Sequence, residues 1–222
     1  MVFYSNKSMK LYNQLYLKLK LWFYNRFKHI TIKDEGAGSS KIRRLKLSSC
    51  GRNNCIIIKK NVVLNQVSIK IFGDDNLIVI GSNNYLKKVN FVIEDSRNVI
   101  EVGAHTYIGE GSLLAALEGT RLSIESECMI AGPCEIRTSD SHSLVDSSQN
   151  KRINYAQDIL IGKHTWIGTG CIVLKGSVIP ANCVVAAKSV VRPLEGIKAG
   201  TLIGGIPAKV IKENINWKAE RI

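Results

Sequence analysis

The sequence lacks several features that would assign it to other protein classes. No apolar run reaches the roughly 18 residues that a membrane span needs. The N-terminus has neither the hydrophobic region nor the small-residue cleavage site of a signal peptide. No CxxC pair occurs among the six cysteines, so we do not expect a metal site. We expect no disulfide framework either, because four of the cysteines fall in a column of small residues described below. These absences predict a cytoplasmic protein.

Acidic residues are also scarce, and none precedes Asp34. The chain has 31 Lys and Arg against 18 Asp and Glu, a formal net charge of +13. Such a charge predicts attraction to nucleic acid, to an anionic membrane face, or to a polyanionic or phosphorylated molecule. No zinc finger, helix-turn-helix or aromatic-basic RNA motif is present, so we do not expect a nucleic-acid partner.

Residues 1–32 are predicted to form a basic amphipathic helix. Apolar side chains recur there at steps of three or four from Tyr12 to Ile30, and lysines and arginines occupy other positions. Such a helix can cover the open end of a repeat array. It can also rest on an anionic membrane surface at the inner face of the membrane. Both interpretations stay open.

From residue 159 onward, aliphatic residues recur at every sixth position, a period that fits neither a helix nor an alternating strand. The members of this column are Ile161, Ile167, Val173, Ile179, Val185 and Val191. The fifth place of each unit is small and includes Cys171 and Cys183. Upstream, Cys128 and Cys134 fall in the same column, where a thiol acts as a compact buried hydrophobe.

The repeat before residue 136 is longer. The aliphatic residues Ile58, Ile80, Val102 and Ile124 are spaced by 22. The positions six and twelve residues after each of them are aliphatic as well, with Lys70 as the exception. Three six-residue units make 18 residues, which is four fewer than the longer repeat. Each 22-residue unit is therefore interpreted as a triangular coil of three short strands with four residues added at a corner. Because one coil cannot bury its apolar face alone, the coils must stack into a solenoid.

The repeats resemble those of the hexapeptide-repeat acyltransferases. The likeness lies in the segments VGAHTY (102–107), IGEGSL (108–113), IGKHTW (161–166) and IGTGCI (167–172). It implies an all-β solenoid, a left-handed parallel β-helix, which departs from the usual right-handed crossover. We place this domain at residues 33–205, followed by a C-terminal segment at 206–222. The resemblance also implies a homotrimer whose active sites are shared between neighbouring subunits.

The six-residue frame breaks once, between Ile136 and Ile161. The stretch at about 137–158 is rich in Ser, Asp and Asn, which predicts a loop that leaves the coil. Loops on a rigid scaffold commonly carry function. This loop contains His142, with Asp140 two residues before it.

Transfer of an acetyl group to a hydroxyl needs a base near neutral pH, and imidazole suits this task. By resemblance to the O-acetyltransferases of the family, His142 is the predicted general base. Asp140 is predicted to orient its imidazole, and Trp166 is predicted to lie near the acceptor and the thioester, where an indole can stack and donate. The other histidines are interpreted as structural: His29, His105 and His164.

The resemblance also implies acetyl-CoA as the donor. The family's pantetheine path maps onto the small residues Gly168, Thr169, Ala186 and Ala187. The segment GGIPAKVIK (204–212) resembles the closing motif of the family, near which the CoA lies. The candidates to contact its phosphates are Lys188, Arg192, Lys209 and Lys212. The family often has Thr-Lys where this chain has Arg192 and Pro193.

The predicted function is therefore transfer of an acetyl group from acetyl-CoA to a carbohydrate hydroxyl by direct attack. The placement of the histidine and the tryptophan is similar to that in enzymes that modify capsular or other surface polysaccharides. A polyanionic acceptor would suit the formal charge of +13. Two alternatives stay open: an N-acetyltransferase acting on a nucleotide sugar, a small sugar or an antibiotic, and a non-catalytic β-helix scaffold.

Overall fold

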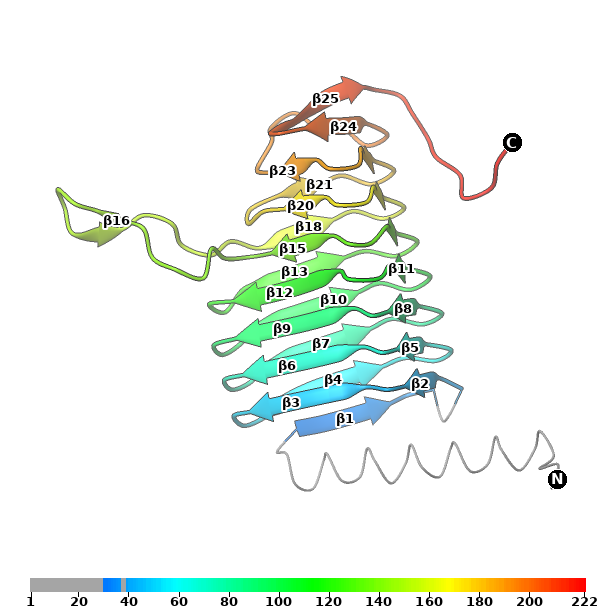
Figure 1. Cartoon of the computed structure of the whole chain (residues 1–222), viewed down its shortest axis with the longest axis vertical. Helices are drawn as coiled ribbons and strands as arrows, with labels where there is room; N and C mark the ends of the chain where they lie inside the picture. Colours follow the sequence, from blue (N-terminus) through cyan, green and yellow to red (C-terminus); the bar gives the residue numbers. More distant parts are fainter. Residues whose placement is uncertain (1–29, 37–38) are drawn as a thin grey trace.

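The chain winds into triangular coils that stack along one axis (Figure 1). The computed structural model describes residues 30–36 and 39–222. The coils are left-handed, as the resemblance implied. Of the helix predicted at 1–32, residues 30–32 belong instead to a strand, and the rest lies outside the described residues. In the part of the chain that is described, no helix is long and apolar enough to cross a bilayer.

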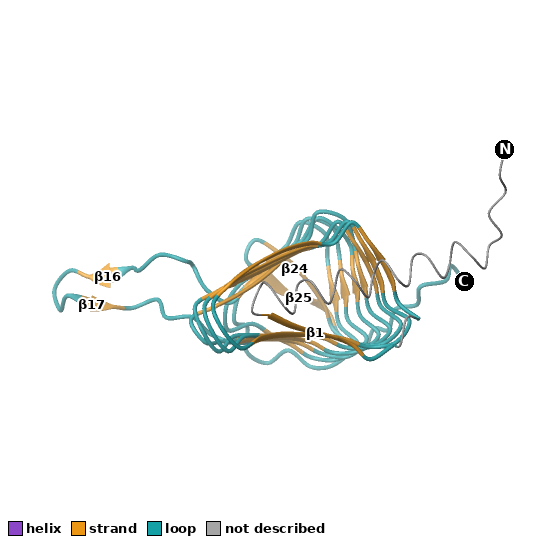
Figure 2. Cartoon of the chain, turned by 90° about the horizontal axis from the view of Figure 1, so that it is seen from below, coloured by secondary structure: helices purple, strands orange, loops and turns teal. Residues whose placement is uncertain are grey.

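Three sheets form the three faces of the prism (Figure 2). Sheet A contains, in spatial order, β1 (Ile30–Asp34), β4 (Asn54–Ile58), β7 (Leu77–Ile80), β10 (Val99–Val102), β13 (Arg121–Ile124), β18 (Ile159–Ile161) and β21 (Val178–Ile179). Sheet B contains β2 (Lys41–Arg43), β5 (Val63–Asn65), β8 (Tyr85–Lys87), β11 (Tyr107–Ile108), β14 (Met129–Ile130), β19 (Trp166–Ile167), β22 (Val184–Val185), β24 (Leu202–Gly205) and the antiparallel β25 (Ala208–Lys212). Sheet C contains β3 (Lys46–Cys50), β6 (Ser68–Phe72), β9 (Asn90–Glu94), β12 (Leu113–Leu117), β15 (Glu135–Arg137), β20 (Ile172–Val173) and β23 (Val190–Val191).

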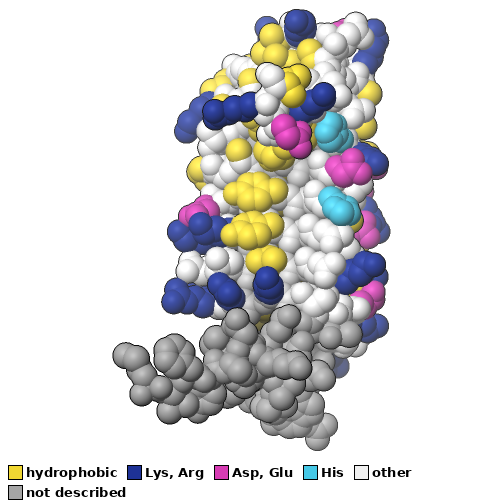
Figure 3. All heavy atoms as spheres, turned by 90° about the vertical axis from the view of Figure 1, so that its right-hand side faces the viewer, with side chains coloured by type: hydrophobic (Ala, Val, Ile, Leu, Met, Phe, Trp, Pro, Cys, Tyr) yellow, Lys and Arg dark blue, Asp and Glu magenta, His cyan; other side chains and the backbone are white. Residues whose placement is uncertain are grey.

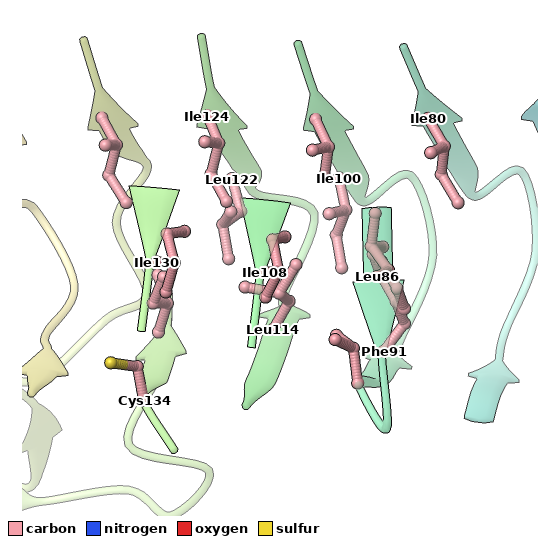
Figure 4. Packing of buried hydrophobic residues seen from close by; sticks show 14 of the residues in the cluster. Ile80, Leu86, Phe91, Ile100, Ile108, Leu114, Leu122, Ile124, Ile130 and Cys134 are labelled. Carbon is pink, nitrogen blue, oxygen red and sulfur yellow. The ribbon is translucent and has the colours of Figure 1, made fainter. Parts of the chain in front are cut away.

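The 22-residue spacing is the register of the parallel ladders. Ile58 pairs with Ile80, and Val102 pairs with both Ile80 and Ile124. Because alternate residues of a strand point to opposite faces, these side chains all enter the prism, where they are buried. Figure 4 shows such side chains from successive coils stacked in columns. The core is thus a column of aliphatic layers, one for each coil.

The placement of the extra residues in the longer coils was predicted wrongly. The side chains of Lys70 and Val92 do not enter the core. In sheet C the inward-facing side chains are those of the preceding residues, Ile69 and Phe91. The four additional residues are not gathered at one corner either. They lengthen the strands of sheets A and C, so that β6 has five residues where the downstream β20 has two.

A ladder of buried asparagines closes the corner between sheets C and A in the longer coils. The Oδ1 of Asn54 accepts from the backbone N–H of Asn76 at 3.0 Å, and the Oδ1 of Asn76 accepts from that of Asn98 at 2.8 Å. The amide groups also bond to one another at 3.1 Å in both steps. Each coil therefore satisfies the polar groups of the next one at a corner where water is excluded.

The cysteines of the small-residue column are compact core residues, as predicted. Cys128, Cys134, Cys171 and Cys183 are buried, and all six cysteines of the chain are free thiols. Burial raises the pKa of Cys128 to about 11, so its thiol stays protonated near neutral pH.

We expect Phe91→Ala to destabilise the protein by about 3–5 kcal/mol, because the substitution leaves a cavity in a fully buried site. The matched control is Phe72→Ala on the same sheet, where the ring is 44% exposed and the loss should stay below about 0.5 kcal/mol. Urea unfolding followed by circular dichroism measures both. Equal losses for the two variants would contradict the assigned inward and outward faces of sheet C.

Candidate active site

Within residues 39–222, the stack of coils is interrupted once, where the sequence frame breaks. After β15 the chain leaves the corner between sheets C and A and forms a hairpin of β16 (Val145–Asp146) and β17 (Lys151–Arg152). It returns at β18, where Ile161 pairs directly with Ile124 as if nothing had been inserted. Figures 1 and 2 both show the hairpin extending from one corner of the prism. The interruption predicted at about 137–158 is therefore an extruded loop on an unbroken scaffold.

The base of this loop is organised by Asn154, which is buried. Its Oδ1 accepts from the backbone N–H of Leu144 at 2.7 Å. Its Nδ2 donates to the backbone carbonyl of His142 at 2.8 Å and to the carboxylate of Asp140 at 2.8 Å. One amide side chain thus fixes the backbone at His142 and Leu144 and the side chain of Asp140 before them.

Lys175, from the following coil, completes the base of the loop. Its ammonium group donates to the carboxylate of Asp140 and, at 2.9 Å, to the carbonyl of Asn154. This ammonium lowers the pKa of Asp140, so the carboxylate is ionised near neutral pH. In the described part of the chain no hydrogen bond joins Asp140 to the imidazole of His142. The contacts of Asp140 hold the loop, and its role in orienting the ring stays a prediction.

A second ion pair holds the far side of the loop. The guanidinium of Arg152 meets the two carboxylate oxygens of Glu118 at 2.7 Å each, and the hydroxyl of Ser139 donates to the same carboxylate at 2.6 Å. The guanidinium is the main reason that the pKa of Glu118 falls to about 2. The sequence did not reveal Asn154, Lys175 or this pair. Lys175 and Glu118 come from other coils, and the partners of Asn154 are brought to it by the folding of the loop itself.

The side chain of His142 lies on the exposed part of the loop. Its backbone is anchored through Asn154, but its ring has no hydrogen-bond partner among the described residues of the chain. An imidazole held by its backbone with free ring nitrogens is suited to exchange a proton with a bound group.

Trp166 lies on the outer face of sheet B and is 39% exposed. Its indole N–H has no acceptor among the described residues. Trp217, from the C-terminal segment, lies 6.0 Å from it between ring centroids. Trp217 also stacks on His164 at 4.5 Å and donates its indole N–H to the carbonyl of that histidine at 2.8 Å. Sequence reasoning missed Trp217, which no repeat signal marks.

His142 and Trp166 do not come together within one chain. The hairpin extends from the corner between sheets C and A, whereas sheet B lies on the opposite side of the prism (Figures 1 and 2). They nevertheless lie at similar heights along the axis, because the loop follows the coil of β14 and Trp166 pairs with Met129 of that strand.

The small residues predicted for the donor site form a strip along the edge of sheet B. Gly168 and Ala186 follow the paired residues Ile167 and Val185 on neighbouring strands. A Cβ on Gly168 would lie 2.6 Å from the backbone nitrogen of Ala187, so the close stacking of these coils requires glycine there. The hydroxyl of Thr169 donates to the carbonyl of Gly132 at 2.6 Å.

Three of the four predicted phosphate-binding cations lie near this strip. The backbone N–H of Lys188 bonds to the carbonyl of Thr169 at 2.8 Å, Lys209 pairs with Gly204 and Lys212 pairs with Leu202 across the closing strands. Arg192 follows β23 on sheet C, so a strand separates it from the strip. All four side chains are exposed, and among the described residues none of them forms an ion pair.

The chain is similar to proteins of known activity, although no family model matches it. A polysialic acid O-acetyltransferase of Neisseria meningitidis is 32% identical over 110 residues, which are 50% of this chain and 50% of that protein. A polysialic acid O-acetyltransferase of Escherichia coli O1:K1 is 34% identical over 105 residues, 46% of this chain and 34% of that protein. The matched segment thus spans half or less of the length of these curated relatives.

The likeness extends further in three dimensions. The solved structure of the polysialic acid O-acetyltransferase OatWY superposes with a TM-score of 0.82 and 29% sequence identity. The superposition covers 87% of this chain and 90% of that one. In its hexapeptide repeats, its left-handed coils and these likenesses, the chain is similar to the hexapeptide-repeat acyltransferases, and among them to the capsular polysaccharide O-acetyltransferases.

Proposed function

We propose that this protein transfers an acetyl group from acetyl-CoA to a hydroxyl of an anionic capsular polysaccharide of the polysialic acid class. The observation that carries the proposal is the single extruded loop, which fixes the backbone of His142 through Asn154 while leaving its ring free. The names of the relatives support the acceptor class. The formal net charge of +13 is complementary to such an acceptor.

In the proposed reaction, the imidazole of His142 takes the proton of the acceptor hydroxyl as its oxygen attacks the thioester carbonyl carbon. A bond forms between that oxygen and the carbonyl carbon, and the negative charge that develops on the carbonyl oxygen is met by the indole N–H of Trp166 or by a backbone N–H. The carbon–sulfur bond then breaks. The sulfur of CoA leaves with the proton held by the imidazolium, so no covalent enzyme intermediate is needed.

The site is proposed to be shared between neighbouring copies of a homotrimer. Rotation about an axis parallel to the stack of coils moves a copy without changing its height. The hairpin of one copy, which lies at the height of Trp166, can therefore meet sheet B of the next copy. Head-to-tail contacts of this kind close into a ring. The shared site accounts for the position of His142 and Trp166 on opposite sides of one chain.

The donor is proposed to lie along the strip of small residues. Gly168, Thr169, Ala186 and Ala187 leave room for a narrow pantetheine arm beside Trp166. Exposed cations at the closing strands, Lys209 above all because it pairs with Gly204, would meet the phosphates.

We expect His142→Ala to lower kcat by at least about a hundredfold, the usual contribution of a general base. Release of the free thiol of CoA, with polysialic acid as the acceptor, measures the rate. Gln149→Ala, on the same hairpin, is the matched control and should keep the wild-type rate. A folded His142→Ala variant with full activity would remove the base assignment.

Two inactive variants should restore each other if the site is shared. Trp166→Ala and His142→Ala, carried on different affinity tags and co-expressed, will form mixed rings in which about a third of the sites combine an intact His142 with an intact Trp166. Mixed trimers purified through both tags should recover activity to about that fraction. If the mixture is as inactive as either variant alone, both residues act within one chain.

Lys175→Met should lower kcat about ten- to a hundredfold, because the loop that carries His142 loses its anchor at Asp140 and Asn154. Amide hydrogen exchange of residues 138–158 should rise, while the urea midpoint of the stacked coils changes little. Lys151→Met, an exposed lysine of the hairpin, is the control. An unchanged kcat together with faster exchange would show that the anchoring has no catalytic role.

A further inference from the structure

A continuous row of large side chains runs along the outside of sheet B from Trp166 toward the first coils. We call Tyr85, Tyr107, Met129 and Trp166 the aromatic column, because each pairs with the next on neighbouring strands. The rings of Tyr85 and Tyr107 stack with centroids 5.8 Å apart and an interplanar angle of 13°. Figure 3 shows hydrophobic side chains, stacked rings among them, gathered in a vertical row on this side of the prism.

The fold does not require large aromatic side chains at these outward positions. The same column holds Val63 before the tyrosines and Val184 after Trp166. Tyr85, Tyr107 and Trp166 are 40%, 39% and 39% exposed, respectively. Contiguous exposed apolar groups of this kind mark binding surfaces. A tyrosine ring with a hydroxyl at its tip suits a ligand that is partly apolar and partly polar.

A ladder of polar side chains lies beside the aromatic column, at the corner between sheets A and B. Asn61 donates to Asn83 at 3.0 Å, and Asn83 lies 3.2 Å from the ring of His105. These residues have positive φ angles of 58°, 59° and 57°, a conformation in which Asn and His are enriched. Higher up, the ring of His164 meets Asn182 at 3.1 Å. The corner thus presents hydrogen-bonding groups at several levels beside the rings.

The C-terminal tail, residues 213–222, turns the part of this face next to Trp166 into a pocket. The backbone N–H of Ile215 bonds to the carbonyl of Gly200 at 2.8 Å, and Trp217 is held on His164. The pocket between the tail and sheet B has a volume of about 400 Å³. Its walls include His105, Tyr107, Glu127, Met129, His164 and Trp217. Glu127 in this wall is paired with Lys163 at 3.0 Å.

The other end of the aromatic column is basic. Lys41 occupies the same outward column, two strands before Tyr85, and Arg43 and Arg44 follow on that strand and its turn. These three side chains are exposed, and within the described ranges none of them forms an ion pair with a carboxylate. The carboxylate of Glu110, by contrast, is already paired with Lys87 and Lys88. In Figure 3, Lys and Arg side chains lie below the two stacked rings.

We propose that the aromatic column and the pocket under Trp217 form an acceptor track, which binds several consecutive sugar units of an anionic polysaccharide whose reacting unit lies at Trp166. This inference rests on the proposed function for the identity of the acceptor. Neighbouring strands lie about 4.8 Å apart, so Tyr85 is roughly 14 Å from the level of Trp166. Tyr85 can therefore contact only an acceptor that has further sugar units beyond the reacting one. The track therefore makes the affinity for the acceptor depend on its length.

The test is the double variant Tyr85→Ala/Tyr107→Ala, with Phe72→Ala as the matched control, an equally exposed ring on another face. Polysialic acid fractions of increasing length serve as acceptors. For long chains the double variant should raise KM about tenfold with kcat unchanged. For the shortest fraction that reacts, and for acetyl-CoA, KM should stay at the wild-type value. An unchanged KM for long chains, or an equal rise for short and long ones, overturns the acceptor track.

Binding measured without turnover separates this inference from the proposed function. Migration of the His142→Ala variant through a gel should be retarded when the gel contains long polysialic acid, and dextran should not retard it. Adding Tyr85→Ala/Tyr107→Ala to this variant should weaken the retardation about tenfold. If the wild type binds in this way but transfers no acetyl group, the proposed function fails and the track stands. If it binds neither polymer, or if light scattering shows that the double variant changes the oligomeric state, the track fails and the face is not an acceptor surface.

Discussion

The in-register stacking of successive coils is the constraint on which the rest of the molecule depends. A triangular coil leaves its backbone N–H and C=O groups pointing along the axis, and only another coil of the same shape satisfies them. Ile58, Ile80, Val102 and Ile124 share one column for this reason. When a side chain points into the prism in one coil, the side chains paired with it in the coils above and below point inward as well.

This constraint explains where the chain can depart from the repeat. An insertion within a strand would break the ladders on both sides, but an insertion at a corner leaves them intact, as the direct pairing of Ile124 with Ile161 shows. The inserted loop is not stacked between two coils, so side chains must satisfy its polar groups. Asn154, Lys175 and the pair of Glu118 and Arg152 do so. A loop held this firmly can carry a side chain to a defined place.

The stacking also leaves the outward positions free to vary, because a β-helix buries only alternate side chains. The aromatic column and the basic residues of the first coils use such positions, whereas Gly168 in the strip of small residues is fixed by the close stacking of the coils. In the proposed trimer, one outer face of the prism holds the donor path and the acceptor surface, while a neighbouring copy provides the base. In this view the active site belongs to the assembly, and each chain carries two halves of different sites.

Much of the fold was readable from the sequence, because the period of the core is a local property of a repeat. The columns at six and 22 residues, the small cysteines and the broken frame at 137–158 predicted the coils and their one interruption. The displacement of the inward position to Phe91 was not readable, since Val92 is aliphatic and fits the period equally well. At Lys70, the exception in the period, the neighbouring Ile69 is the inward residue.

For the candidate site, the sequence by itself determined which residue types are available: one histidine in the only frame break, one tryptophan in the repeat, and small residues after it. The tertiary structure decided how they are arranged. It placed His142 and Trp166 on opposite sides of one prism, brought Lys175 to Asp140 and laid Trp217 on His164. These contacts join residues from different coils, or from the tail and a coil. Their positions follow from how the whole chain packs, which no local period encodes.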